Sequence, residues 1–79
     1  MAQRTTADET LPREDLATYL RELAAEFERD NEGITVPVGN KNVALTPPET
    51  LDMSVEVVER SSMLRGDRET VAIELSWKR

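Results

Sequence analysis

The stretch that decides the fold is Val71-Ala72-Ile73-Glu74-Leu75-Ser76-Trp77. Successive residues of a β-strand point to opposite faces, so the odd-numbered apolar side chains of this stretch share one side. The even-numbered Glu74 and Ser76 share the other side. This alternation predicts an antiparallel strand with one face on a hydrophobic core and the other face in water.

Two shorter segments, 34–38 and 42–45, lie upstream of this strand and flank Gly39-Asn40. Gly-Asn is a two-residue hairpin signal, so we expect these segments to pair as antiparallel strands. Pro37 has no N–H to donate, which predicts an edge position for the first of them. An odd-length loop would set apolar against polar residues and is disfavoured. The predicted facing pairs are Ile34–Leu45 and Val36–Val43, or Val36–Leu45 and Val38–Val43 if the turn is centred one residue later.

A third alternating segment begins at Leu51 and predicts a strand through Val57. A turn over residues 61–67 containing Gly66 follows, and the final strand runs from Arg68 or Glu69 to Trp77. The connector 46–50 contains Pro47-Pro48 and is predicted to be stiff and extended. The sequence leaves open whether this connector makes a hairpin or a crossover.

One helix is predicted over residues 12–29, because proline is favoured at a first helical position and acidic residues follow it. Glu22, Glu26, Arg21 and Arg29 are expected on its wet side, and residues 30–33 are expected to end it. Residues 1–10 are polar and aperiodic and are predicted to be a disordered tail. The apolar stripe of the helix comprises Leu16, Leu20, Leu23 and Phe27, with Tyr19 and Ala24 beside it.

These elements predict a two-layer α+β fold of the order αββββ. One N-terminal helix would cover one face of a four-stranded antiparallel sheet. A chain of 79 residues has room for one core, so residues 11–79 are expected to form a single domain.

The composition argues against several functional classes. The chain has no cysteine and no histidine, which disfavours structural zinc and leaves no catalytic thiol or imidazole. The serines have no histidine base, and the three glycines do not form a phosphate loop. We therefore expect no enzyme, no cofactor and no metal. No apolar run is long enough to cross a bilayer or to form a signal peptide, which predicts a cytoplasmic protein without membrane contact.

The charge balance points to a salt-rich environment. Sixteen acidic residues against ten basic ones give a net charge of −6, and only Lys41 and Lys78 are lysines. Concentrated salt screens the repulsion that such a charge creates. Salt adaptation is therefore the favoured interpretation, and an ordinary acidic mesophilic domain is the alternative.

Four segments together form a recognisable pattern: residues 14–23, residues 38–49 (VGNKNVALTPPE), residues 55–61 and the closing strand with Trp77. In this pattern the chain resembles the Amphi-Trp domain family, small proteins common in haloarchaea. The resemblance covers residues 11–79 and implies a halophilic source. It supplies no activity and no site residues.

Two groups of residues are candidate sites. Arg60, Arg65 and Arg68 form the only local cluster of positive charge, and guanidinium groups bind phosphate or carboxylate. The alternative is a solvated turn in which these arginines pair with Glu59, Asp67 or Glu69. Candidate interface residues are Met63 and Leu64 in the same loop and Trp77, for which a place in the core is the favoured alternative.

The sequence favours a small non-catalytic interaction or accessory domain, with an unknown protein or a second copy as its partner. Strand addition at a free sheet edge would be one route to such a partner. The alternative is a nucleic-acid or small-anion binding module that uses the loop with Arg60, Arg65 and Arg68. The net charge of −6 argues against nucleic acid, because affinity for a polyanion comes from neutralising its phosphates.

Overall fold

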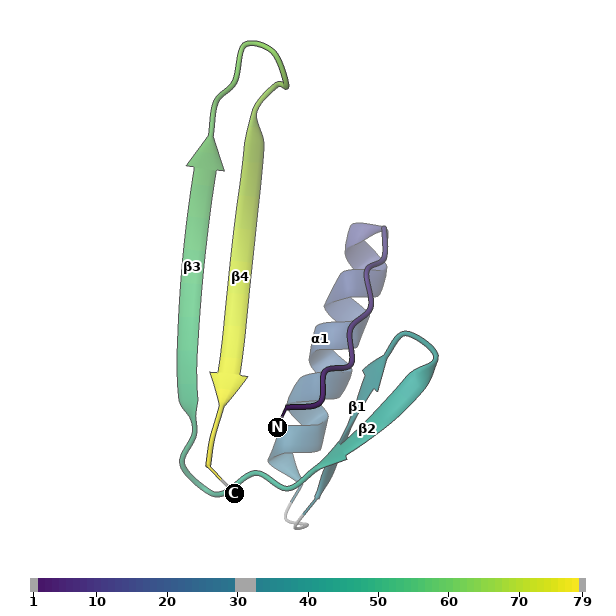
Figure 1. Cartoon of the computed structure of the whole chain (residues 1–79). Helices are drawn as coiled ribbons and strands as arrows, with labels where there is room; N and C mark the ends of the chain where they lie inside the picture. The colour runs from purple at the N-terminus through teal and green to yellow at the C-terminus, as the bar shows by residue number, and fades with distance from the viewer. Residues whose placement is uncertain (1, 30–32, 79) are drawn as a thin grey trace. The chain divides into compact units, whose positions relative to one another are not determined.

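The computed structural model describes residues 2–29 and 33–78, which contain one helix and four strands (Figure 1). The chain divides into two compact units, Met1–Pro47 and Pro48–Arg79. The elements are α1 (Arg13–Glu28), β1 (Ile34–Val38), β2 (Lys41–Leu45), β3 (Asp52–Arg60) and β4 (Arg68–Ser76).

In the first unit, β1 and β2 form the predicted antiparallel hairpin. Ile34 faces Leu45 and Val36 faces Val43, so the register centred on Gly39-Asn40 is confirmed and the shifted register is wrong. Gly39 has a φ of 62°, and no non-glycine residue in the described part of the chain has a positive φ. A positive φ at the first loop residue alone fits a type II′ turn, which places glycine there.

Helix α1 begins one residue later than predicted. Pro12 is the N-cap and has extended backbone angles, and its carbonyl accepts hydrogen bonds from the N–H groups of Asp15 and Leu16 at 3.1 and 3.2 Å. Proline fits this position because it fixes φ near −65° and needs no hydrogen-bond acceptor. The helix ends at Glu28, and part of its predicted stop signal, residues 30–32, lies outside the described residues.

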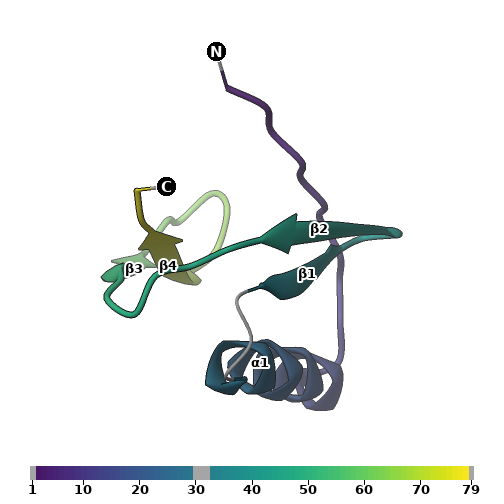
Figure 2. The ribbon, with the colours of Figure 1, turned by 90° about the horizontal axis from the view of Figure 1, so that it is seen from below.

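Helix α1 closes the outer edge of β1. The Tyr19 hydroxyl donates to the Pro37 carbonyl at 2.8 Å, and the Glu26 carboxylate accepts from the Thr35 N–H at 2.8 Å. In an antiparallel pair every second residue points its backbone groups away from the partner strand. Thr35 and Pro37 are these residues in β1, and Pro37 has no N–H to offer. Figure 2 shows β1 as the strand nearer to α1.

The predicted single four-stranded sheet is wrong. The structure has two two-stranded sheets, β1–β2 and β3–β4. Alternation in a sequence tells which side chains share a face but does not tell which strands pair. The ladder cannot continue outward from β1, where the helix already occupies the free backbone groups. The connector after β2 leads from one sheet to the other, so it makes neither a hairpin nor a crossover within one sheet.

Replacing Tyr19 with phenylalanine tests the closure. The Tyr19→Phe variant removes only the hydroxyl that donates to Pro37. We expect the free energy of unfolding to fall by about 1 kcal/mol, the usual net worth of such a hydrogen bond. Urea denaturation followed by circular dichroism measures this change. Thr18→Ala is the control because it removes an exposed hydroxyl from the same helix, and an equal loss in both variants would contradict the closure.

The core of the first unit is small. Ile34 is 4 % exposed and is the one buried hydrophobic residue in the described part of the chain. Val36, Val38 and Val43 are half-buried. Residues 2–12 have no regular structure, and Ala7 lies beside the turn, 3.2 Å from where a Cβ on Gly39 would stand.

In the second unit, β3 and β4 pair along nine residues each, from Asp52 opposite Ser76 to Arg60 opposite Arg68. This register confirms that the odd-numbered apolar residues of both strands share one face. Val71, Ile73 and Leu75 are exposed, so the second unit taken by itself has no core that covers this face. The sequence pattern identifies the apolar face correctly but cannot supply the surface that would cover it.

Candidate functional site

The apolar face of the β3–β4 hairpin is the most extensive hydrophobic surface of the second unit. We call its three successive cross-strand pairs the hairpin face. Its six side chains are between 37 % and 68 % exposed. Scattered exposed apolar residues are ordinary, but a contiguous exposed patch marks an interaction surface. The pairs are Met53–Leu75, Val55–Ile73 and Val57–Val71.

The other face of the hairpin is mostly polar and carries both signs of charge. Ser54 lies opposite Glu74, and Glu56 lies opposite Ala72. These residues line a shallow hollow of about 360 Å³. Val58, paired with Thr70, is the one half-buried residue of β3 and sits on this side. The two faces therefore differ in chemistry although they belong to the same two strands.

The loop between β3 and β4 holds itself in shape through Ser62. Its hydroxyl oxygen accepts hydrogen bonds from the N–H groups of Leu64 and Arg65 at 3.3 and 3.1 Å. Its carbonyl accepts from the Gly66 N–H at 2.9 Å, and Gly66 has a φ of 78°. Glycine adopts this left-handed conformation without steric cost, which explains its place in the predicted turn.

The structure brings the three predicted arginines together. Arg60, Arg65 and Arg68 line one cavity of about 630 Å³ with Ser61, Ser62, Gly66 and Asp67. Among the described residues, no ion pair joins these arginines to Glu59, Asp67 or Glu69, so the predicted pairing is wrong. Strand alternation gives the reason for the glutamates. Glu59 and Glu69 face each other on the hairpin-face side, whereas Arg60 and Arg68 face each other on the opposite side.

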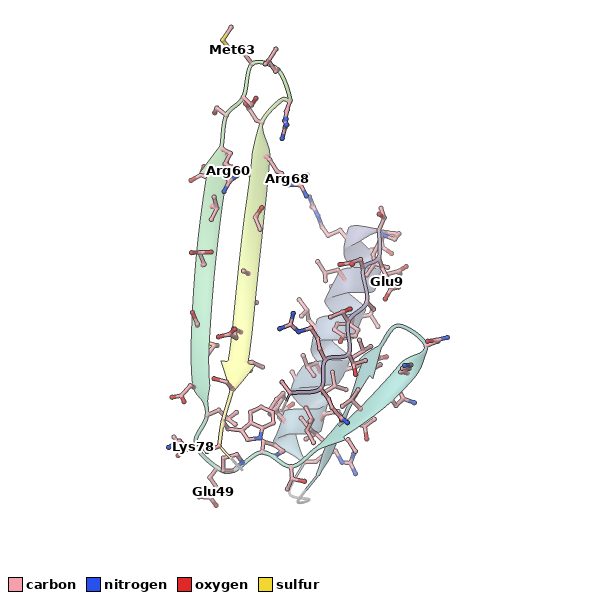
Figure 3. All side chains as sticks on the ribbon, in the orientation of Figure 1. Glu9, Glu49, Arg60, Met63, Arg68 and Lys78 are labelled. Atoms are coloured by element: carbon pink, nitrogen blue, oxygen red, sulfur yellow. The ribbon has the colours of Figure 1, made fainter. Side chains whose placement is uncertain are left out.

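The candidate interface residues do not form one surface. Met63 and Leu64 are fully exposed at the loop, and Figure 3 shows Met63 projecting from its tip. Neither covers a core. Trp77 is half-buried and follows β4 at the other end of the hairpin. Nine paired residues separate the two ends, a distance of about 30 Å at the usual rise of a strand.

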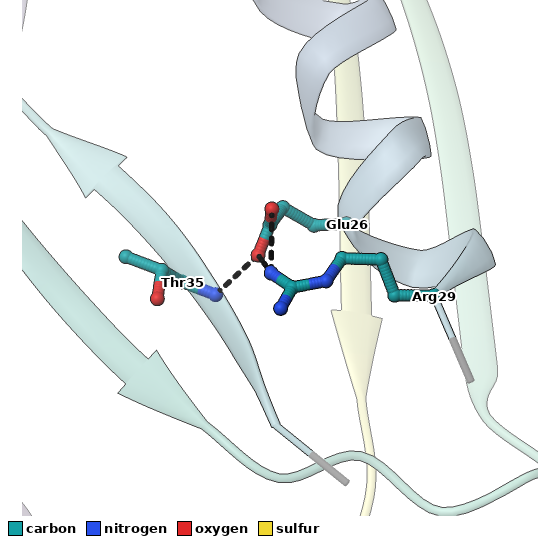
Figure 4. Close-up of polar contacts among 3 residues, drawn as sticks. All are labelled: Glu26, Arg29 and Thr35. Atoms are coloured by element: carbon teal, nitrogen blue, oxygen red, sulfur yellow. Dashed lines mark hydrogen bonds and ion pairs between the residues drawn. The ribbon is translucent and has the colours of Figure 1, made fainter. Parts of the chain in front are cut away.

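Sequence reasoning missed the role of Glu26, which it placed on the wet side of the helix. The carboxylate of Glu26 accepts from the Thr35 N–H and forms an ion pair with Arg29 at 3.1 Å (Figure 4). The Thr35 hydrogen bond, helped by Arg29, lowers the pKa of Glu26 below its ordinary value of 4.5, although partial burial opposes the shift. A signal was present, because position 26 directly precedes Phe27 and flanks the apolar stripe.

This lowered pKa makes the stability of the first unit pH-dependent. A carboxyl whose pKa is lowered on folding stabilises the folded state above its unfolded pKa. That contribution is lost as the pH falls from about 4.5 through the lower folded value. We expect Glu26→Gln to lower the free energy of unfolding at neutral pH, with a deficit that shrinks below pH 4.5. Urea denaturation across this range measures the deficit, Glu22→Gln on the exposed face of α1 is the control, and a pH-independent deficit would contradict the assignment.

No cluster of three metal-ligating side chains exists among residues 2–29 and 33–78. None of the helical residues that the structure describes forms a segment long and apolar enough to cross a membrane. The β3–β4 hairpin offers an apolar face and an arginine-lined cavity, and these are the two candidate sites of the second unit.

Comparison with known proteins identifies the family. A search of curated proteins and a search of solved structures each found no match. The model of the Amphi-Trp domain matches residues 2–79, which is nearly the whole chain. The resemblance seen in the sequence is thereby confirmed, and this chain belongs to the Amphi-Trp domain family.

Proposed function

We propose that this protein is a small, non-catalytic interaction domain that pairs with a second copy of itself through the hairpin face. The observation that carries the proposal is the exposure of all six apolar side chains of that face. Three successive cross-strand pairs without a polar group favour a dry contact over a solvated surface. The absence of histidine and cysteine from the sequence supports a role without catalysis.

The energetics are adequate for self-association. Complete burial of a Val, Leu, Ile or Met side chain contributes about 1.5–3 kcal/mol, and the side chains of the hairpin face are already about half covered. Covering them fully would then contribute about 1 kcal/mol each, or about 12 kcal/mol for the twelve side chains of two copies. Association costs about 4–15 kcal/mol in lost freedom, so the two terms are of similar size. A dimer of moderate, concentration-dependent stability follows.

A second copy is the partner that this surface fits best. In a two-fold dimer each copy contributes the same patch, so an apolar surface without charges is complementary to itself. A chain of fewer than about 80 residues commonly gains stability by such pairing. The outer edge of β1 is occupied by α1 and is therefore not open to strand addition. The exposed apolar side chains of the hairpin face favour the second unit as the place where the partner binds.

The acidic surface sets the conditions under which pairing is strongest. Two copies that each carry a net charge of −6 repel each other in dilute buffer. Molar salt shortens the screening length to about 3 Å and removes most of this repulsion. We propose that the protein works in a salt-rich cytoplasm, where the hairpin face dominates association.

Size-exclusion chromatography with light scattering tests the proposal. In molar KCl we expect the mass to rise from one chain to two across the micromolar range, and the transition to move to higher concentration as KCl is lowered. A mass of one chain at every concentration would overturn self-association. That result would indicate instead that another part of the same chain covers the hairpin face in solution.

A further inference from the structure

The cavity at the loop end of the β3–β4 hairpin collects positive charge in an acidic chain. Three arginines and one aspartate line it, so its charged groups sum to +2, whereas the whole chain carries −6. The residues come from both strand ends and from the loop between them. This surface is separate from the hairpin face, because Arg60 and Arg68 lie on the opposite side of the ladder.

The arginines that line this cavity have no internal counter-ion among the described residues. Arg60 and Arg68 are directly opposite each other in the last pair of the ladder, and like charges in such a pair are destabilising. Alternation turns the neighbouring Glu59 and Glu69 to the other face, where they do not line the cavity. Asp67 lines the cavity, but no ion pair between it and an arginine occurs among the described residues. An anion in the cavity would relieve the repulsion.

The loop presents these groups in a fixed arrangement. Ser62 braces it through three hydrogen bonds, two to its hydroxyl oxygen and one to its carbonyl. Since the hydroxyl oxygen accepts both of its bonds, its proton remains available to donate to a ligand. The loop that carries Ser62 and Arg65 is thus braced within itself, and Arg60 and Arg68 adjoin it at the strand ends and complete the lining.

We propose that this cavity binds the phosphate group of a small molecule. Guanidinium groups form paired, charge-assisted hydrogen bonds with oxyanions and are preferred over lysine where phosphate is recognised. Three guanidinium groups suit a tetrahedral phosphate, which offers more oxygens than the two of a carboxylate. A nucleic-acid polymer is disfavoured, because the remaining surface of the chain repels a polyanion.

NMR titration with inorganic phosphate at constant ionic strength tests this proposal. We expect saturable shifts of the backbone amides of residues 60–68 and of the arginine Nε–H signals in that segment. Arg65→Gln removes the loop guanidinium from the cavity and should weaken binding about tenfold. Arg21→Gln is the matched control, because it removes the same charge from the exposed surface of α1 and should bind as the wild type does. Asp67→Asn should bind more tightly, because it removes the one negative charge of the lining.

The outcomes separate phosphate recognition from general charge effects. Shifts that do not saturate, or that are equal in Arg65→Gln and the wild type, would overturn the proposal. If acetate bound as tightly as phosphate, the cavity would be a general site for carboxylates and not a phosphate site, and the proposal would be overturned. If a single-stranded oligonucleotide bound more tightly than inorganic phosphate, the cavity would be part of a nucleic-acid interface, and the proposal of a small-molecule site would be overturned.

Discussion

Val57→Asp is expected to abolish self-association, whereas Val58→Asp at the adjacent position leaves it intact. Val57 belongs to the hairpin face, is 63 % exposed and lies opposite Val71. A carboxylate there would enter the dimer contact in both copies without a counter-ion. Burying an unpaired charge is far more costly than burying an apolar group. We therefore expect the dissociation constant of the dimer to rise about a hundredfold or more.

The neighbouring valine provides a matched control. Val58 has the same side chain but points to the opposite face, and it is more covered within the chain than Val57. If folding of the isolated chain alone decided the outcome, Val58→Asp would be the more damaging variant. Sedimentation equilibrium gives the dissociation constants and circular dichroism reports folding. Pairing through this face would be contradicted if the two variants had equal dissociation constants. It would also be contradicted if the wild type were monomeric and Val57→Asp merely unfolded the chain.

Ile34→Ala is expected to destabilise the first unit more than any other single truncation there. Ile34 is 4 % exposed, and the other apolar residues of the β1–β2 hairpin are half-buried or exposed. Large-to-small substitutions at buried isoleucine cost about 2–5 kcal/mol because a cavity adds to the lost transfer energy. A small domain has only a few kcal/mol in reserve, so unfolding of this unit is the expected result.

A graded series distinguishes a packing effect from a general disturbance. Ile34→Val removes one methylene and should cost about 0.5–1.5 kcal/mol, well below the alanine variant. Urea denaturation gives the free energies, and amide hydrogen exchange shows whether the loss is centred on β1 and β2. If the alanine and valine variants were equally stable, Ile34 would not be the packing centre of the unit.

Local features of this fold were predictable because they depend on neighbouring residues. Gly39-Asn40 predicted the hairpin and limited its register to two alternatives, one of which pairs Ile34 with Leu45 as observed. Alternation identified the shared face of Val71 and Ile73. The cluster of Arg60, Arg65 and Arg68 was also predictable, because these residues are close in sequence, whereas the cavity that they line is known only from the structure.

Features that depend on distant residues were not predictable in the same way. Closure of the β1 edge requires Tyr19 and Glu26 to meet Pro37 and Thr35, and no sequence period encodes those partners. The four-stranded sheet was inferred from strands that could pair rather than from a signal that they do. Pairing of the arginines with nearby glutamates was expected from proximity in sequence, but alternation sets adjacent side chains on opposite faces.

The Glu59–Glu69 pair has a consequence for how two copies can be oriented. These glutamates sit at one end of the hairpin face, beyond Val57 and Val71. If two hairpins stacked head to head, four carboxylates would meet at the same end, whereas head-to-tail stacking keeps the two acidic pairs about 30 Å apart. In the proposed dimer, this repulsion would favour the head-to-tail orientation of the two hairpins. Its discrimination weakens as salt rises, because the repulsion on which it depends is screened.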